Sequence, residues 1–284
     1  MTEMYRVSKI LNNNGVIAID MDENKEYVIL GKGVGFGKKV SQRFDKPEGC
    51  TTYRLEQETE RGSAKELVKG IEPEYLEIAD AILTESQKVF GDSIDRGILF
   101  PLADHISFAV ARIRRNEQIS NPLTEDIKVL FYSEFKVAET LKTILRERLQ
   151  IEIDDHEVGY VALHIHSAIG DEKVSVAMQT ARAVRECIDM IEKATGKPID
   201  VLSLSYNRLM NHMKYMVARA STGEKLNLDM NEYMLDQYPQ AYKVATDICK
   251  NLEGCIGHKL DETETGYLAM HIERVANDER EIEE

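Results

Sequence analysis

The chain contains an internal repeat in which matching residues keep one constant separation in sequence. His164 in the segment ALHIHSAI recurs as His271 in AMHIERV, and His105 recurs as His212 at the same separation, which we call the repeat offset. The segments FKVA and YKVA keep this register without a gap. A repeat with so long a period indicates tandem homologous domains. It divides the chain into a head at residues 1–58 and two copies of one domain.

The repeated part has the hydrophobic periodicity of amphipathic helices. Apolar residues recur at three- and four-residue spacing in eight segments, which are residues 75–90, 106–115, 135–149, 157–169, 184–194, 206–220, 241–252 and 264–276. We therefore expect two homologous all-α helical-bundle domains, at residues 66–170 and 171–284.

An Asp-x-x-Glu motif precedes each histidine-bearing helix of the repeat. Asp154 with Glu157, and Asp261 with Glu264, are again related by the repeat offset. The motif is typical of a capping box, in which the Asp accepts from the N3 amide and the Glu reaches back to the N-cap amide. We therefore expect both pairs to cap helix N-termini.

The head has a different pattern of short apolar segments separated by turns. The segments YRVSKIL, GVIAIDM, EYVIL and KKVSQRF are separated by NNNG, DENK and the glycine-rich GKGVGFG. This predicts a small antiparallel four-stranded β domain, so the whole chain is a multidomain α+β protein. A domain this small buries little core alone, and we expect it to dimerise or to pack on another part of the chain.

Charge is distributed unevenly between the head and the rest. The net charge is −14, but residues 1–55 carry nine basic against seven acidic residues. An acidic body with a basic head argues against general nucleic-acid binding. No apolar run approaches the roughly 18 residues of a membrane span, and the N-terminus lacks a signal peptide. The four cysteines have no CxxC spacing, so we expect a cytoplasmic protein with reduced thiols.

Four interpretations of the repeated histidines can be compared. They could be satisfied core or surface residues. A metal site is disfavoured, because His164 and His166 point about 200° apart on a helix and no zinc motif accompanies them. A Ser-His-Asp site lacks its motif. Phosphate acceptance fits a neutral imidazole, and Arg112 and Arg219 each share a helix face with a histidine seven residues earlier.

Two clusters in the head have the chemistry of an RNA contact. LNNN at residues 11–14 offers amides to base edges, and GKGVGFG at residues 31–37 offers flexible backbone and the ring of Phe36. Lys9, Lys32 and neighbouring lysines supply positive charge for phosphates. The alternative is two ordinary hairpin turns in which Asn and Gly accept positive φ.

LNNN and GKGVGFGKK, followed by two domains with DHI/NHM and ALHI/AMHI histidines, resemble the BglG/SacY family of transcriptional antiterminators, and its glucose-type branch most. The resemblance implies a dimeric RNA-binding head that binds a leader-mRNA hairpin and prevents termination before sugar-uptake genes. The residues that match family contacts with RNA are Lys9, Asn12, Asn14, Gly31, Lys32 and Phe36. Lys32 replaces an Arg of some relatives.

The resemblance also implies that the two helical domains are regulation domains of the sugar phosphotransferase system (PTS). Their matching phosphate acceptors are His105, His164, His212 and His271. The implied donors are the EIIB domain of a PTS permease for the first domain and HPr for the second. The protein would be a homodimeric regulator and not an enzyme, without a metal or cofactor. His166 has no second counterpart, because Glu273 occupies that position.

Other function classes remain as alternatives. A histidine phosphocarrier of the PTS would use the same histidines but would not need the head. A scaffolding dimer leaves the registered histidines unexplained. A DNA-binding activator requires a helix-turn-helix module, whereas the head is predicted to consist of strands.

Overall fold

The computed structural model describes residues 4–56, 58, 59, 62–117, 119–170, 173–201 and 203–277. The chain divides into two compact units. The first comprises Met1–Asn121 and Ser133–Val174, and the second comprises Pro122–Tyr132 and Ser175–Glu284. No helix within the described ranges is both long and apolar enough to cross a membrane.

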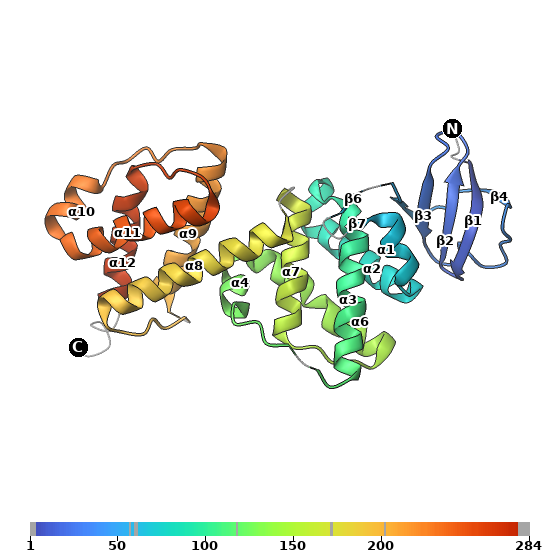
Figure 1. Ribbon diagram of the computed structural model, residues 1–284, viewed down its shortest axis with the longest axis horizontal. Helices are drawn as coiled ribbons and strands as arrows, with labels where there is room; N and C mark the ends of the chain where they lie inside the picture. The colour runs from blue at the N-terminus through green and yellow to red at the C-terminus, as the bar shows by residue number, and fades with distance from the viewer. Residues whose placement is uncertain are drawn as a thin grey trace. The chain divides into compact units, whose positions relative to one another are not determined.

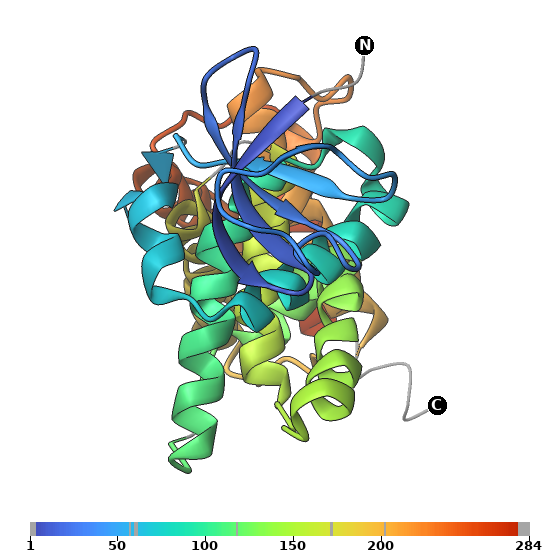
Figure 2. The same cartoon turned by 90° about the vertical axis from the view of Figure 1, so that its right-hand side faces the viewer.

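The head forms an antiparallel sheet of five strands in the order β4-β1-β2-β3-β5. This sheet is drawn in blue in Figure 2. The strands are β1 (Met4–Asn12), β2 (Gly15–Asp20), β3 (Glu26–Leu30), β4 (Arg43–Asp45) and β5 (Thr51–Arg54). The prediction of an antiparallel head is confirmed, but the count of four strands is wrong. The segment KKVSQRF contributes only the start of β4, and β5 adds to the outer edge of β3. A short hairpin of β6 (Glu58–Thr59) and β7 (Gly62–Ser63) follows.

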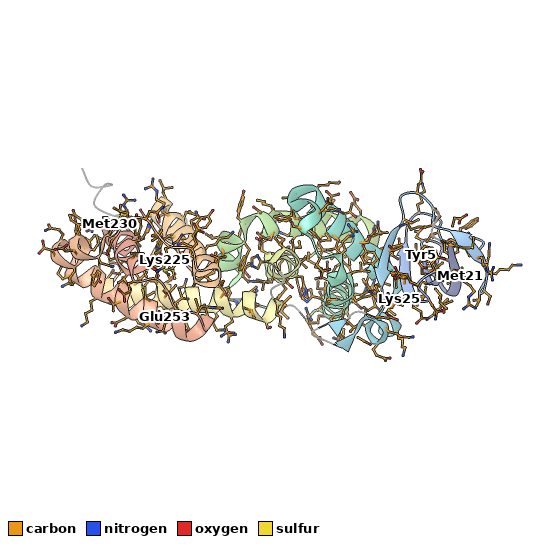
Figure 3. The ribbon with its side chains drawn as sticks, turned by 90° about the horizontal axis from the view of Figure 1, so that it is seen from above. Tyr5, Met21, Lys25, Lys225, Met230 and Glu253 are labelled. Carbon is orange, nitrogen blue, oxygen red and sulfur yellow. The ribbon has the colours of Figure 1, made fainter. Side chains whose placement is uncertain are left out.

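Both faces of the sheet contain buried side chains. Tyr5, Val7 and Val16 belong to the hydrophobic core of the head (Figure 3 labels Tyr5). Tyr53 on β5 is also buried, and its ring packs edge-on against Phe100 of the first helical domain, with centroids 6.4 Å apart. The head therefore packs on the helical part of its own unit, as expected for a domain with a small core.

The helices of the first unit follow the head directly. They are α1 (Ala64–Gly70), α2 (Pro73–Phe90), the short η1 (Gly91–Ser93) and η2 (Arg96–Ile98), α3 (Leu99–Arg114), α5 (Tyr132–Ala138), α6 (Thr140–Leu149) and α7 (Asp155–Gly170). Pro73 starts α2 at a position where its missing N–H costs nothing, and Gly91 ends it at φ +70°. Helix α2 packs on α3, and α3 packs on α7.

The second unit is also built from helices (Figure 1). Its helices are α8 (Val174–Thr195), α9 (Leu204–Thr222), α10 (Asn231–Gln237), α11 (Pro239–Ile256) and α12 (Thr263–Asn277). When the repeat offset is added to the residue numbers of α3 and α7, the resulting ranges match those of α9 and α12 to within two residues at either end. Ser203 caps α9 by accepting from Tyr206 N, and Gly223 ends it at φ +73°.

The helices differ from the prediction in two respects. The predicted helix at 135–149 is interrupted at Glu139, which separates α5 from α6, whereas its counterpart α11 is unbroken. The seven-residue helices α1, α4 (Thr124–Leu130) and α10 were not identified, because two turns give too few positions to define a period.

Helix α4 groups with the second unit, although the chain on both sides of it belongs to the first. Its Asp126 is buried and accepts a hydrogen bond from the hydroxyl of Tyr206 on α9 at 3.1 Å. Burial raises the pKa of Asp126 above its ordinary value, against the lowering effect of this bond. The counterpart α10 packs instead on α11 and α12 of its own copy.

Candidate functional site

Backbone hydrogen bonds join two loops of the head. One is the turn between β1 and β2, and the other is the glycine-rich loop after β3. Gly31 N donates to Asn14 O at 2.9 Å, and Gly35 N donates to Asn13 O at 2.9 Å. The side chain of Asn14 accepts from Gly33 N at 3.0 Å. The two clusters singled out in the sequence therefore form one surface.

Glycine is required where these loops meet. A Cβ atom on Gly35 would lie 2.1 Å from Asn12 O and 3.2 Å from Gly15 O. A Cβ atom on Gly31 would lie 2.3 Å from Cys50 Sγ and 3.0 Å from Cys50 Cα. Only glycine lets the glycine-rich loop approach these neighbouring atoms so closely, and any role of the two glycines in turn geometry is additional.

Five of the six predicted RNA-contact residues lie on these loops, and we call them the loop patch: Asn12, Asn14, Gly31, Lys32 and Phe36. The Phe36 ring is 74 % exposed although it is apolar. Lys32 is also exposed. An exposed aromatic ring beside a lysine and two amides can stack on a base and contact its edges or phosphates. Lys9 is exposed on β1, outside these loops.

In the first unit, the two repeated histidines meet between α3 and α7. The rings of His105 and His164 have centroids 5.4 Å apart at an interplanar angle of 46°. Both residues are buried, and Tyr160 packs against His105 with centroids 5.7 Å apart. Two residues that are distant in sequence thus share one site.

The second unit contains the same pair between α9 and α12. His212 and His271 stack with centroids 4.8 Å apart at 29°, and Tyr267 stacks on His212 at 6.1 Å. The nitrogens His212 Nε2 and His271 Nδ1 are buried without a hydrogen-bond partner in the described part of the chain. Because such atoms normally have partners, they are positions where an incoming polar group can bind.

A buried glutamate and an arginine complete each histidine site. In the first copy, Arg112 Nη2 donates to Glu157 Oε1 at 2.8 Å, and His105 Nε2 lies 3.5 Å from Glu157 Oε2. Although burial works to raise it, the interactions with His105 and Arg112 hold the pKa of Glu157 below its usual value. The carboxylate is therefore charged next to the histidine.

In the second copy, Arg219 binds Glu264 through two hydrogen bonds. Arg219 Nε donates to Oε1 at 2.6 Å and Nη2 donates to Oε2 at 2.9 Å. His212 Nε2 lies 3.6 Å from the same carboxylate, whose side chain is 1 % exposed. Bidentate pairing of this kind fixes both side chains.

The capping-box prediction is therefore wrong for the two glutamates. Asp154 does accept from Glu157 N at 3.2 Å. The side chain of Glu157 turns inward to Arg112, and that of Glu264 turns inward to Arg219, because a buried carboxylate without a counter-charge is more costly than an uncapped amide at a helix end. Both glutamates obey the repeat offset as the histidines do, and this was a signal that could have identified them.

The local electrostatics keep the second-copy histidines neutral. Burial, then His271, then Arg219 lower the pKa of His212 to about 3. Burial, then Arg274, then Arg208 lower the pKa of His271 to about 4. Both imidazoles are unprotonated near neutral pH, and a neutral imidazole is the nucleophilic form.

The remaining histidines lie apart from these pairs. His166 Nδ1 contacts Glu134 Oε1 at 2.9 Å, and His156 Nδ1 contacts the carbonyl of Asn121 at 3.2 Å. His258 lies exposed after α11. His166 thus uses a carboxylate of its own, which agrees with the expected divergence of His164 and His166 on one helix.

Comparison with known proteins agrees with the two kinds of site. The family model described as "CAT RNA binding domain" matches residues 5–62, and the model described as "PRD domain" matches residues 80–168 and 185–275. The fold and sites thus define a nucleic-acid-binding head joined to two copies of a histidine-bearing regulation domain. The chain belongs to the family of antiterminators that combine a CAT RNA-binding domain with two PRD domains.

The similar proteins extend over almost the whole chain. The GlcA/glcB genes antiterminator of Staphylococcus carnosus is 30 % identical and covers 94 % of each chain. Protein GlcT of Staphylococcus haemolyticus is 28 % identical over 96 % of each chain. Transcription antiterminator LicT of Bacillus subtilis is 27 % identical over 95 % of this chain and 98 % of its own. A crystal structure of GlcT CAT-PRDI has a TM-score of 0.51 and 28 % identity, and covers 59 % of this chain and 99 % of that one.

Proposed function

We propose that this chain is a transcriptional antiterminator of the glucose type. The head binds a hairpin in a nascent leader mRNA, the hairpin excludes an overlapping terminator, and RNA polymerase continues into sugar-uptake genes. The main support is the loop patch, which combines an exposed aromatic ring, amides and a lysine in a chain related over its length to antiterminators. Those relatives favour this function over the phosphocarrier alternative.

The three functional domains are proposed at residues 1–58, 66–170 and 171–284. The protein acts in the cytoplasm as a homodimer, in which the two heads bind one hairpin. Lys9, Asn12, Asn14, Gly31, Lys32 and Phe36 are the proposed RNA contacts. The chain has no catalytic reaction of its own in this proposal, and uses no metal or cofactor.

Control is proposed to come from phosphorylation of His105, His164, His212 and His271. A PTS permease EIIB domain donates to the first domain, and HPr donates to the second. The neutral imidazole attacks with its lone pair, a phosphorus–nitrogen bond forms, and the bond from phosphorus to the donor side chain breaks.

The buried glutamate gives this modification a structural effect. A phosphoryl group adds about −1.5 to −2 charges, and in the second copy it would arise close to Glu264, whose carboxylate is 3.6 Å from His212. Repulsion between the two groups, and attraction of Arg219 to the phosphate, would weaken the Arg219–Glu264 pair. The contact between α9 and α12 would then shift, and with it the relative placement of the two heads in the dimer.

RNA binding is tested with the full chain and a family-type antiterminator hairpin, at fixed salt. We expect selective binding over a scrambled hairpin. Phe36→Ala removes a stacking surface worth about 1–3 kcal/mol per base, so affinity should fall roughly 5- to 150-fold. Val40→Ala is a control, because Val40 is a second exposed apolar side chain of the head, outside the loop patch. Equal binding to both hairpins would refute the proposal.

Phosphorylation is tested by incubating the chain with each PTS donor and locating phosphohistidine by mass spectrometry. We expect the HPr-dependent label to be lost in a His212→Ala, His271→Ala double variant. The permease-dependent label should be lost in the His105→Ala, His164→Ala variant. His258→Ala should keep both, since His258 is exposed and outside the pairs. Label that persists in both double variants would exclude the paired histidines as acceptors.

A further inference from the structure

One carboxylate of the first helical domain holds two asparagines of the loop patch. Asn12 Nδ2 donates to Glu77 Oε1 at 2.7 Å, and Asn14 Nδ2 donates to Glu77 Oε2 at 3.2 Å. Glu77 lies on α2, which is outside the head. Each carboxylate oxygen therefore accepts from a different asparagine.

The asparagine oxygens are used within the head, which leaves the amide NH₂ groups as the outward donors. Asn12 Oδ1 accepts from Asn14 N at 2.8 Å, and Asn14 Oδ1 accepts from Gly33 N at 3.0 Å. Because backbone N–H groups can only donate, these bonds fix which end of each amide faces outward. The groups that Glu77 accepts from are the donors available for an RNA acceptor atom.

Glu77 is itself held in position. Arg148 Nη1 at the end of α6 lies 3.7 Å from Glu77 Oε2. Three residues further along α2, Asp80 accepts from the Tyr53 hydroxyl of β5, and Arg96 Nη2 donates both to Asp80 at 2.8 Å and to Tyr53 at 2.7 Å. Residues three apart share a helix face, so α2 contacts the head at two adjacent points.

The contact covers only part of the loop patch. Phe36 is 74 % exposed and Lys32 is exposed. An RNA strand could therefore meet the ring and the lysine first, while the asparagine donors stay bound to Glu77. Phosphate and base carbonyl oxygens are acceptors like those of a carboxylate, so full engagement of RNA requires Glu77 to leave.

We propose that the face of α2 containing Glu77 and Asp80 is a docking surface for the head's own loop patch, and that it competes with RNA. Glu77 occupies the amide donors of Asn12 and Asn14 in place of an RNA acceptor. This rests on the proposed RNA-binding function and adds to it a direct way for the first regulation domain to lower RNA affinity. Release of this contact is the step that frees the loop patch.

The experiment measures hairpin affinity of the full chain for wild type, Glu77→Ala and Glu74→Ala. Glu74 is an acidic residue of the same helix that forms no hydrogen bond or ion pair with the head among the described residues, so its variant controls for lost charge. We expect Glu77→Ala to bind the hairpin about 5- to 10-fold more tightly, since it removes two charge-assisted hydrogen bonds, and Glu74→Ala to bind like wild type. Glu77→Gln, which keeps the side-chain size, should give a smaller gain in the same direction.

Hydrogen exchange of the segment around Asn12–Asn14, without RNA, provides a second measurement. Exchange should accelerate in Glu77→Ala and not in Glu74→Ala. Unchanged or weaker hairpin affinity in Glu77→Ala, with selective binding by wild type, would overturn the competition and leave the RNA-binding function intact. No selective binding by any form would overturn the proposed function itself, and the competition with it.

Discussion

Glu264→Ala should destabilise the second unit by about 3–5 kcal/mol, because it removes the buried member of an ion pair and leaves the largely covered guanidinium of Arg219 without its counter-charge. The Arg219 side chain is 15 % exposed, and both of its hydrogen bonds to Glu264 would be lost. The free energy is measured by native-state hydrogen exchange of amides in α9 and α12 of the full chain. Exchange in the head should not change.

Glu262→Ala is the matched control for this loss. It removes the same charge two residues earlier, from an exposed side chain, and should change stability by no more than about 0.5 kcal/mol. A double variant, Arg219→Met with Glu264→Leu, removes both charges and should cost less than Glu264→Ala alone. If Glu264→Ala and Glu262→Ala behave alike, the Arg219–Glu264 pair does not stabilise the site.

Gly35→Ala should reduce hairpin affinity roughly a hundredfold, or about 3 kcal/mol, the upper end of the cost of overpacking. The new Cβ would lie 2.1 Å from Asn12 O and 3.2 Å from Gly15 O. Both atoms belong to the backbone, so no side-chain rotation can relieve the contact. The glycine-rich loop would have to separate from the β1–β2 turn, which disperses the loop patch. Affinity of the full chain for the hairpin is the measurement.

Gly70→Ala serves as the control for this substitution. Gly70 ends α1, has open space around its Cα, and does not have positive φ. Alanine there should leave RNA affinity unchanged and have little effect on stability. The thermal midpoint of unfolding of the full chain with Gly35→Ala should be measured as well. A Gly35→Ala protein that binds the hairpin like wild type would show that the two loops need not stay in contact.

The sequence predicted the two helical copies well, for a reason specific to them. A repeat offset without gaps places most matching helices at corresponding residues of the two copies, and α4 and α10 correspond to the residue. The same offset relates His105 to His212 and His164 to His271, and in each copy the two histidines form one pair, with ring centroids 5.4 Å and 4.8 Å apart. Residues that are related by the repeat offset thus occupy equivalent positions in the two structures.

Other features depend on contacts that no local pattern encodes. Glu157 fits a capping box by its spacing alone, and only the position of Arg112 on another helix draws it inward. Strand β5 was missed because it pairs with β3 across the glycine-rich loop and the whole of β4. The bonds from Asn12 and Asn14 to Glu77 join residues that are 65 and 63 positions apart in the chain. In each case the deciding partner is distant in sequence.

The assignment of α4 to the second unit means that the chain passes between the units three times, after residues 121, 132 and 174. The boundary between the two repeated domains of the sequence therefore differs from the boundary between the two compact units of the structure. A fragment that ends near residue 174 would keep α4 but lose Tyr206, which supplies a hydrogen bond to buried Asp126. Three segments of chain therefore connect the two units, where a single linker between the repeats would give only one.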